Sequence, residues 1–519
     1  MEHRSRRQFL REVGRGMLAV SVAGGLASEL ELGIARADEG PSPLNFGPLE
    51  PLVALLQETP IAKLIPACTE RLRSGTSLRD LLAAAALANA RTFGGEDYVG
   101  FHVMMALAPA YHMAQELPEP LRALPVLKVL YRNSKRIEES GGRSKEVLHA
   151  VVPADAIPDG PQGEALREVV RRREVESAER RFAALARRSV DEAFNDLLIS
   201  VQDATEVHRV VLPYRAWDLL EIVGKEHAHT LLRQSLRYCL RGQHNSLPER
   251  YTESQRILPK LFDQYHLLEK SPTRREADDA WIDRMTQTLF RSKPAEAADA
   301  AAAALAEGMA PDAVGEAIAL AANQLVLRDH GRREREVQPG KPLGSVHGDS
   351  IGVHASDSAN AWRNTARVAN PRNACASLIL GAYQVALDRG DRGGDFLNWE
   401  PQPRPEALEQ VKSTGPDELL KEADGAIREN DQARAAAIVH RYGELGHPHR
   451  PVFDLLLRYA TSEDGALHAE KYYRTVTEEF GSSRPAFRWR QLTALARVTA
   501  SEYGRPAPGY AEAKEILKV

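Results

Sequence analysis

Apolar residues recur at three- and four-residue spacings in almost every segment of this chain, whereas strict alternation over five or more positions is rare. The three- and four-residue spacing gathers apolar side chains on one face of an α-helix, while alternation would gather them on one face of a strand. Alanine and leucine, both strong helix formers, are abundant. The sequence therefore predicts an all-α fold built from packed helical hairpins.

Glycine, proline and short polar clusters interrupt the helical pattern and indicate where the chain divides. The main interruptions lie at 40–48, 152–163, 331–344 and 388–405. We expect a large helical domain over residues 41–388, a linker over residues 389–415 and a smaller, repeat-like helical module over residues 416–519. Similar Ala-rich hairpin segments at 73–91 and 306–328 are separated by irregular gaps, which argues against a regular repeat array.

The N-terminus has the features of a twin-arginine export signal. Arg6 and Arg7 precede Phe9 and Leu10, and a mildly apolar segment ends at the small-residue site "ARA" of Ala35–Ala37. We expect residues 1–37 to be removed on export to the periplasm or another extracytoplasmic compartment. The apolar segment is too short and too weakly hydrophobic for a stable membrane span, so the mature protein is not expected to be an integral membrane protein. The twin-arginine machinery carries folded proteins, which favours a bound metal or redox group.

Composition excludes several other classes of protein. The three cysteines, Cys68, Cys239 and Cys375, are far apart and form no C-x-x-C or C-x-x-C-H motif, so we expect neither a disulfide framework nor covalently attached haem. Formal net charge is -4, and acidic and basic residues are interleaved, as over residues 171–188. This pattern is typical of solvated helix faces and not of a nucleic-acid-binding surface.

Two apolar helical stretches combine a histidine with a downstream proline. In "GFHVMMALAPAYHMA", His102 and His112 flank Pro109, and in "DATEVHRVVLPYRAWDLL", His208 precedes Pro213. Proline inside a helix leaves the carbonyl four residues before it without its usual hydrogen bond. Each histidine could be a ligand or a core residue bonded to such a carbonyl, and one helix alone does not decide between them.

A third stretch, "VGKEHAHTLLRQSLRYCL", contains His227 and His229. The two lie two positions apart and therefore on different faces of a helix, so only one can face a given pocket. Leu231 and Gln234 continue the semi-buried face of His227, which makes His227 the better candidate.

The segment "LGSVHGDSIGVHASDSANAWRNTARVAN" holds the densest group of polar candidates. His347 and His354 are seven residues apart and would face the same way on one helix. Asp349 and Asp357 are candidates to orient a ring nitrogen. A stripe formed by Gly344, Gly348 and Gly352 would let another helix or a flat ligand approach closely.

The same segment contains "GDSIG", a literal G-x-S-x-G around Ser350. A nucleophile elbow needs a hydrophobic strand before the serine and a helix after it. The preceding "VQPGKPLGSVH" is not a strand pattern, so a serine hydrolase is a weak third alternative. The paired E-x-x-H motifs of di-iron carboxylate bundles and the Cys/His spacings of zinc sites are absent.

Four of these segments together resemble the questin oxidase-like family and a related group of exported bacterial helical proteins. They are "GFHVMMALAPAYHMA", "VHRVVLPYRAWDLL", "KEHAHTLLRQSL" and "VHASDSANAW", and the resemblance spans roughly residues 75–390. It implies that His102, His208, His227 and His354 match family histidines, with His112, His229 and His347 matching less closely. It also implies oxidative ring opening of quinones with reduced nicotinamide and oxygen. An exported protein has no pool of reduced nicotinamide, and no Gly-rich dinucleotide fingerprint follows a strand here.

The leading hypothesis is that His102, His208, His227 and His354 line one pocket as metal ligands or proton-transfer groups, with His112, His347, Asp349 and Asp357 contributing to cofactor binding. The pocket would hold a transition metal (Fe, Cu or Zn), non-covalent haem or a redox-active aromatic ligand, because imidazole suits these metals and exchanges protons near neutral pH. Oxidoreductase activity would follow from the resemblance. The alternative is a non-catalytic helical scaffold or binding protein of the cell envelope, whose histidines only satisfy buried carbonyls.

Overall fold

The computed structural model describes residues 42–519, except 156, 158, 242–246, 270–273 and 392–394. In this part of the chain, α-helices and short 3-10 turns provide the regular structure, and β-pairing is limited to isolated bridges such as that between Pro43 and His149. The predicted all-α class is confirmed. The twin-arginine pair and the expected cleavage site after Ala37 lie outside the described residues.

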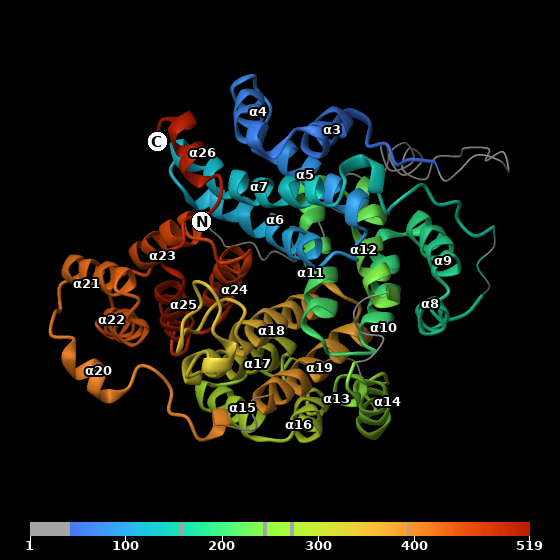
Figure 1. The fold of residues 1–519 in the computed structure, drawn as a ribbon. Helices are drawn as coiled ribbons and strands as arrows, with labels where there is room; N and C mark the ends of the chain where they lie inside the picture. Colours follow the sequence, from blue (N-terminus) through green and yellow to red (C-terminus); the bar gives the residue numbers. More distant parts are fainter. Residues whose placement is uncertain (1–41, 156, 158, 242–246, 270–273, 392–394) are drawn as a thin grey trace, which may run out of the picture.

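In the first half of the chain, α5, α7 and α12 pack against two central helices, α6 and α11, and the remaining helices lie further out (Figure 1). Their bounds are α3 Glu50–Glu58, α4 Ile61–Arg73, α5 Leu78–Phe93, α6 Tyr98–Glu116, α7 Ala123–Glu139, α8 Gln162–Arg171, α9 Val175–Arg188, α10 Val190–Val201, α11 Val207–Val223, α12 Ala228–Arg241, α13 Glu249–Thr252 and α14 Ser254–Tyr265.

The second half of the chain forms a layer of long helices, α15 to α19, followed by the C-terminal helices. Their bounds are α15 Asp279–Arg291, α16 Pro294–Ala306, α17 Pro311–Arg328, α18 Ile351–Val368, α19 Pro371–Gly390, α20 Pro405–Gln410, α21 Pro416–Arg428, α22 Gln432–Glu444, α23 Arg450–Ser462, α24 His468–Ser482, α25 Trp489–Glu502 and α26 Tyr510–Leu517.

Side-chain caps fix where three of the central helices begin. Asp97 caps α6, Glu206 caps α11 and Ser350 caps α18, and each side chain accepts a hydrogen bond from a backbone N–H three residues further on. Pro109 and Pro213 lie inside α6 and α11, as expected from the sequence. The Ala-rich helix α17 begins differently, with Pro311 after Ala310, which offers no side-chain cap.

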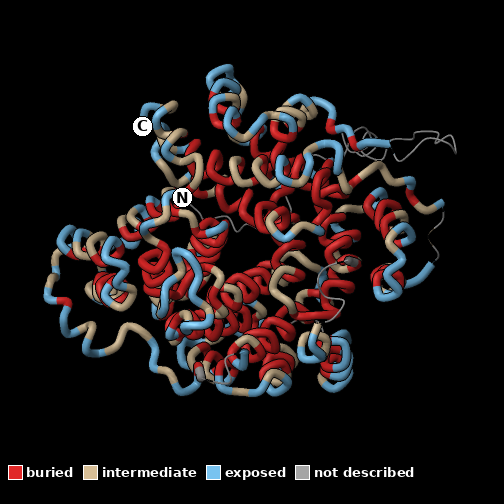
Figure 2. Tube along the Cα trace, in the orientation of Figure 1, coloured by how far each residue is buried: buried red, intermediate tan, exposed pale blue. Residues whose placement is uncertain are grey.

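The C-terminal helices share their core with the rest of the molecule. The hydrophobic cluster that contains α21 to α25 also includes Met113 of α6, Val326 of α17 and Val353 of α18. Figure 2 shows that the most buried part of the chain runs through the middle of the molecule, where α6, α11, α18 and α24 lie. No helix in the described ranges combines the length and apolar character that a membrane crossing requires.

The segment 343–370 differs from its prediction. The helix α18 begins only at Ile351, so His347 lies in the loop before it and does not share a helical face with His354. Gly344 has a φ of 76° in a turn, and of the predicted glycine stripe only Gly352 is helical. A close helix approach does occur at Gly352, where a Cβ atom would lie 2.6 Å from the backbone nitrogen of Val326 in α17.

Candidate functional site

Four histidines from four different helices meet in the centre of the molecule. His102 lies on α6, His208 on α11, His354 on α18 and His468 on α24. The Nε2 atoms of His102 and His208 are 3.2 Å apart, and those of His354 and His468 are 3.1 Å apart. Two imidazole pairs thus lie side by side.

The two pairs also contact each other. The ring centres of His102 and His208 are 4.7 Å apart, and those of His354 and His468 are 5.2 Å apart. Across the pairs, the separations are 5.3 Å between His102 and His468 and 5.8 Å between His208 and His354. The four rings therefore form a closed set, called the histidine cluster below.

The outer nitrogens of the first pair are both occupied. The Nδ1 of His102 lies 2.7 Å from the carbonyl oxygen of Tyr98, one turn earlier on α6, and the Nδ1 of His208 lies 2.6 Å from Oε1 of Glu206. Both partners only accept hydrogen bonds, so each Nδ1 carries a hydrogen. When both rings are neutral, each of the two facing Nε2 atoms then carries a lone pair and no hydrogen.

Burial keeps three rings of the cluster, His102, His354 and His468, unprotonated. It lowers the pKa of His354 to about 3, and it lowers the pKa of His102 and of His468 well below the ordinary histidine value. The positive charge of Lys471 on α24 lowers the pKa of the same three rings further. These imidazoles therefore present lone pairs at neutral pH.

His468 carries one unsatisfied nitrogen. Its Nδ1 is buried without a hydrogen-bond partner, while its Nε2 faces His354. One turn further along α24, Lys471 is buried, and burial lowers the pKa of its ammonium group to about 8, partly opposed by Asp357. Asp357 itself is buried, which raises its pKa, and it accepts a hydrogen bond of 2.8 Å from the hydroxyl of Thr475.

The cluster is not fully enclosed. The side chain of His208 is 13% exposed, and the half-exposed ring of Tyr98 contacts both His102 and His208 at ring-centre distances of 4.4 Å and 6.0 Å. His354 also keeps partial exposure. The cluster therefore lies nearest to the surface on the side of Tyr98.

The structure places the other predicted histidine ligand elsewhere. His227 ends a 3-10 turn over Lys225–His227 and packs against Phe46, with ring centres 6.0 Å apart. His208 lies in the first turn of α11 and His227 beyond its last turn, and the helix between them is about 22 Å long. His229 stacks on Phe182. Neither joins the cluster, so the structure does not bring His227 together with His102, His208 and His354.

Three further predicted residues also lie outside the cluster. His112 is ten residues after His102, about 15 Å further along α6, where it packs against Tyr111. Asp349 pairs with Arg332 and Lys341, and these hydrogen bonds outweigh burial and lower its pKa to about 2. His347 faces Glu502 and Asp349, with Nδ1 to carboxylate distances of 3.4 Å and 3.6 Å.

Asp349 and Asp357 do not orient a ring of the cluster by a direct hydrogen bond, because they accept hydrogen bonds from Arg332, Lys341 and Thr475. The residue that does so is Glu206, which sequence reasoning missed. Its signal was the acidic residue two positions before His208 in "EVH". His468 was also missed, since "GALHAEKYY" follows the expected linker and was assigned to a separate module.

Ser350 has a structural role. It is the N-cap of α18, and its hydroxyl accepts a hydrogen bond from the backbone N–H of Val353. No strand precedes it within the residues that the structure describes. The strand, serine and helix order of a nucleophile elbow is therefore absent at this position.

The arrangement suits a metal ion in part. Four imidazoles on one tetrahedral ion, with metal–nitrogen bonds of about 2.0–2.1 Å, have ring centres about 5 Å apart, which is close to the separations in the cluster. Over the described ranges, however, no group of three or more His, Cys, Asp or Glu side chains forms a ready-made metal site. The two Nε2 pairs would have to move towards each other around a shared ion.

Comparisons of the chain with protein-family models, with curated proteins and with solved structures found no match.

Proposed function

We propose that the histidine cluster binds one transition metal ion and that the protein is an exported, metal-dependent oxidoreductase acting on a small organic molecule. His102, His208, His354 and His468 would be the ligands through their Nε2 atoms. This replaces His227 of the predicted ligand set with His468.

The observation that carries the proposal is the facing lone pairs of His102 and His208. Their Nε2 atoms are 3.2 Å apart, while both Nδ1 hydrogens are used by Tyr98 and Glu206. Two acceptors at this distance repel each other unless a cation lies between them. With metal–nitrogen bonds of about 2.0–2.1 Å, nitrogens at this separation subtend an angle of about 100° at the ion, close to tetrahedral.

The donor set limits which ion fits. Four neutral imidazoles without a carboxylate or thiolate suit iron, copper, nickel or zinc and do not suit magnesium or calcium. Of these, iron and copper support oxidation chemistry. The resemblance to questin oxidase-like proteins and the twin-arginine signal both favour a redox metal, loaded before export.

The protein's own residues would prepare the site for this role. Burial and the charge of Lys471 keep His102, His354 and His468 unprotonated, so protons compete weakly with a metal. His208 is partly exposed and contacts half-exposed Tyr98, so a substrate would approach the cluster from this side. A bound ion would supply redox chemistry at that approach.

The test is the metal content of the protein after maturation through its own export route. Elemental analysis should find about one iron or copper ion per chain, and His354→Ala should lose it with a modest effect on stability. The alternative to a metal ion between the Nε2 atoms of His102 and His208 is a proton that the two rings share. In that case the protein would contain no bound metal, and the metal-dependent function would be wrong.

A second candidate is the non-catalytic scaffold, and one observation favours it. The described residues contain no ready-made site with three or more ligands, so His354 and His468 would form an internal hydrogen bond between helices and a proton would be shared by His102 and His208. Under this alternative, His354→Ala would lower thermal stability strongly, because it leaves the Nε2 of buried His468 without its partner. No metal would be recovered from the parent protein.

A further inference from the structure

We propose that Glu206 is the positioning residue of the cluster: its carboxylate fixes the tautomer and the ring orientation of His208 and thereby sets the affinity for the metal. This inference rests on the proposed function. It assigns to Glu206 the role that sequence reasoning gave to Asp349 and Asp357.

The contact between Glu206 and His208 is short and directional. Oε1 of Glu206 accepts a hydrogen bond of 2.6 Å from Nδ1–H of His208, and both side chains are only 13% exposed. A charge-assisted bond of this length in a largely buried setting is stronger than one between neutral groups. It holds the hydrogen on Nδ1 and turns the Nε2 lone pair towards His102.

The second carboxylate oxygen is held independently. Oε2 of Glu206 accepts hydrogen bonds from the backbone N–H of Arg209, at 3.0 Å, and from the hydroxyl of Tyr238 on α12, at 2.8 Å. With both oxygens bonded, the carboxylate cannot rotate away from His208. The carboxylate that orients the imidazole of His208 is therefore held by two elements, the backbone at the start of α11 and Tyr238 of α12.

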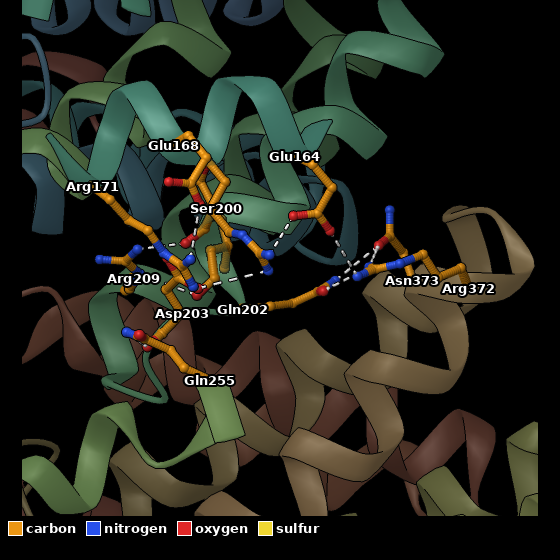
Figure 3. Close-up of polar contacts among 12 residues, drawn as sticks. Glu164, Glu168, Arg171, Ser200, Gln202, Asp203, Arg209, Gln255, Arg372 and Asn373 are labelled. Carbon is orange, nitrogen blue, oxygen red and sulfur yellow. Dashed lines mark hydrogen bonds and ion pairs between the residues drawn. The ribbon is translucent and has the colours of Figure 1, made fainter. Parts of the chain in front are cut away.

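The backbone that carries Glu206 is also fixed by a polar network (Figure 3). Asp203, three residues earlier, accepts two hydrogen bonds of 2.8 Å from Arg171 of α8, and its carbonyl accepts one of 3.0 Å from Gln255 of α14. The guanidinium of Arg209 donates to the carbonyls of Ser200 and Val201 at the end of α10. The turn before α11 thus cannot shift without breaking contacts to three helices.

A carboxylate that accepts from a ligand histidine raises the basicity of the ring and lowers the cost of ordering it, and the loss of such a partner typically weakens metal binding 10–100-fold. His102 has a different partner, the carbonyl of Tyr98, which is fixed by the helix and carries no charge. Glu206 is therefore the only anionic partner hydrogen-bonded to a ring of the cluster in the contacts described above.

The test compares Glu206→Gln with Asp97→Asn. Both residues are carboxylate N-caps of helices that carry a cluster histidine, but the Asp97 side chain accepts from Gly100 and Arg136 and makes no hydrogen bond to an imidazole in the structure. In both variants the amide oxygen can still accept the capping backbone N–H, so both should keep most of the capping contribution. Only Glu206→Gln should alter His208.

The probe is Co²⁺, whose visible absorption bands report the ligand field. We expect Glu206→Gln to weaken Co²⁺ binding about 10–100-fold and to shift the bands, and Asp97→Asn to leave both unchanged. Tyr238→Phe should give a smaller effect in the same direction. Unchanged affinity and spectrum in Glu206→Gln would show that Glu206 is only a helix cap and would overturn the inference.

A second readout does not need a metal. In protein labelled with ¹⁵N at histidine, the parent should show His208 with its hydrogen on Nδ1, and Glu206→Gln should populate the other tautomer. If the parent binds no metal but this tautomer change occurs, the proposed function fails and the positioning role of Glu206 stands. If the parent binds metal and the tautomer does not change, the positioning role fails alone.

Discussion

Gly348 packs so closely against His468 that a Cβ atom at position 348 would lie 2.4 Å from the Cβ of His468. The backbone N–H of Gly348 also donates a hydrogen bond of 2.9 Å to Oε1 of Glu502 on α25. Residue 348 therefore needs to be glycine because of this approach, and the loop before α18 helps to hold the histidine cluster.

Gly348→Ala should displace His468 from His354. We expect a loss of about 1–3 kcal/mol in the free energy of unfolding, as for other overpacked sites, and weaker metal binding. The control is Gly425→Ala in α21, where an added Cβ would meet nothing within 4 Å. That change should stabilise the protein by about 0.5–1 kcal/mol. Denaturant unfolding and Co²⁺ titration of both variants check the prediction, which fails if Gly348→Ala binds Co²⁺ like the parent.

His468→Ala and His227→Ala should separate the cluster from the other buried histidines. Both side chains are at most 9% exposed, but only His468 contacts other cluster rings. Elemental analysis should therefore find less than about one tenth of the parent's metal in His468→Ala. This variant lacks one of the four ligands, and His354 loses the imidazole that faces it. His227→Ala should keep a full complement. Equal metal content in the two variants would remove His468 from the site.

Lys128 and Glu470 tie α7 to the first turn of α24, next to His468. Their side chains are 3% and 0% exposed, the Nζ to Oε1 distance is 2.7 Å, and Lys128 also donates to the carbonyls of Ala460 and Glu463. Lys128→Met should cost about 3–5 kcal/mol of unfolding free energy, since it leaves a buried carboxylate without its counter-ion.

The double variant Lys128→Met with Glu470→Met should recover much of that loss, because no buried charge is then unpaired. Lys135→Met, on an exposed face of the same helix and 4.0 Å from Glu139, should change stability by less than about 0.5 kcal/mol. Thermal and denaturant unfolding measure all three. A double variant that is less stable than Lys128→Met would contradict the unpaired-charge explanation.

The fold class and most of the cluster could be predicted from the sequence, because these depend on local patterns. Apolar periodicity gives helices, and a histidine in an apolar helix containing proline singled out His102 and His208, which both lie in the cluster. His227 was chosen over His229 on the assumption that one continuous helix places His227 on the same face as Leu231 and Gln234. In the structure His227 lies in a 3-10 turn over Lys225–His227, before α12 begins at Ala228. His468 could not be found in this way, since its approach to His354 depends on the packing of α24 against α18, which no local spacing encodes.

The orienting group was mispredicted for a similar reason. Asp349 and Asp357 are close to His354 in sequence, but Asp349 is held by Arg332 and Lys341 in the loop before α18, and Asp357 accepts from Thr475. Glu206 reaches the ring of His208 because the N-cap position turns its side chain back over the first turn of α11, where His208 lies. Helix starts are set by caps, and a cap two residues before a histidine is a signal that a sequence can show.

Acid should destabilise the protein through His229. This imidazole is buried on Phe182 in a site remote from the cluster, and burial lowers its pKa to about 3, whereas an unfolded histidine titrates near 6.5. Between these two values the unfolded chain binds a proton that the folded chain does not, so stability is present above about pH 6.5 and falls as the pH drops towards 3. One such proton contributes a slope of up to about 1.4 kcal/mol per pH unit.

His229→Phe keeps an aromatic ring against Phe182 and removes the titration, so its unfolding free energy should fall less steeply than that of the parent between pH 6 and pH 4. His440→Gln, on a partly exposed face of α22, should follow the parent. Denaturant unfolding at a series of pH values gives the three slopes. Parallel slopes for the parent and His229→Phe would mean that His229 takes up its proton in the folded protein as readily as in the unfolded chain, in conflict with its burial.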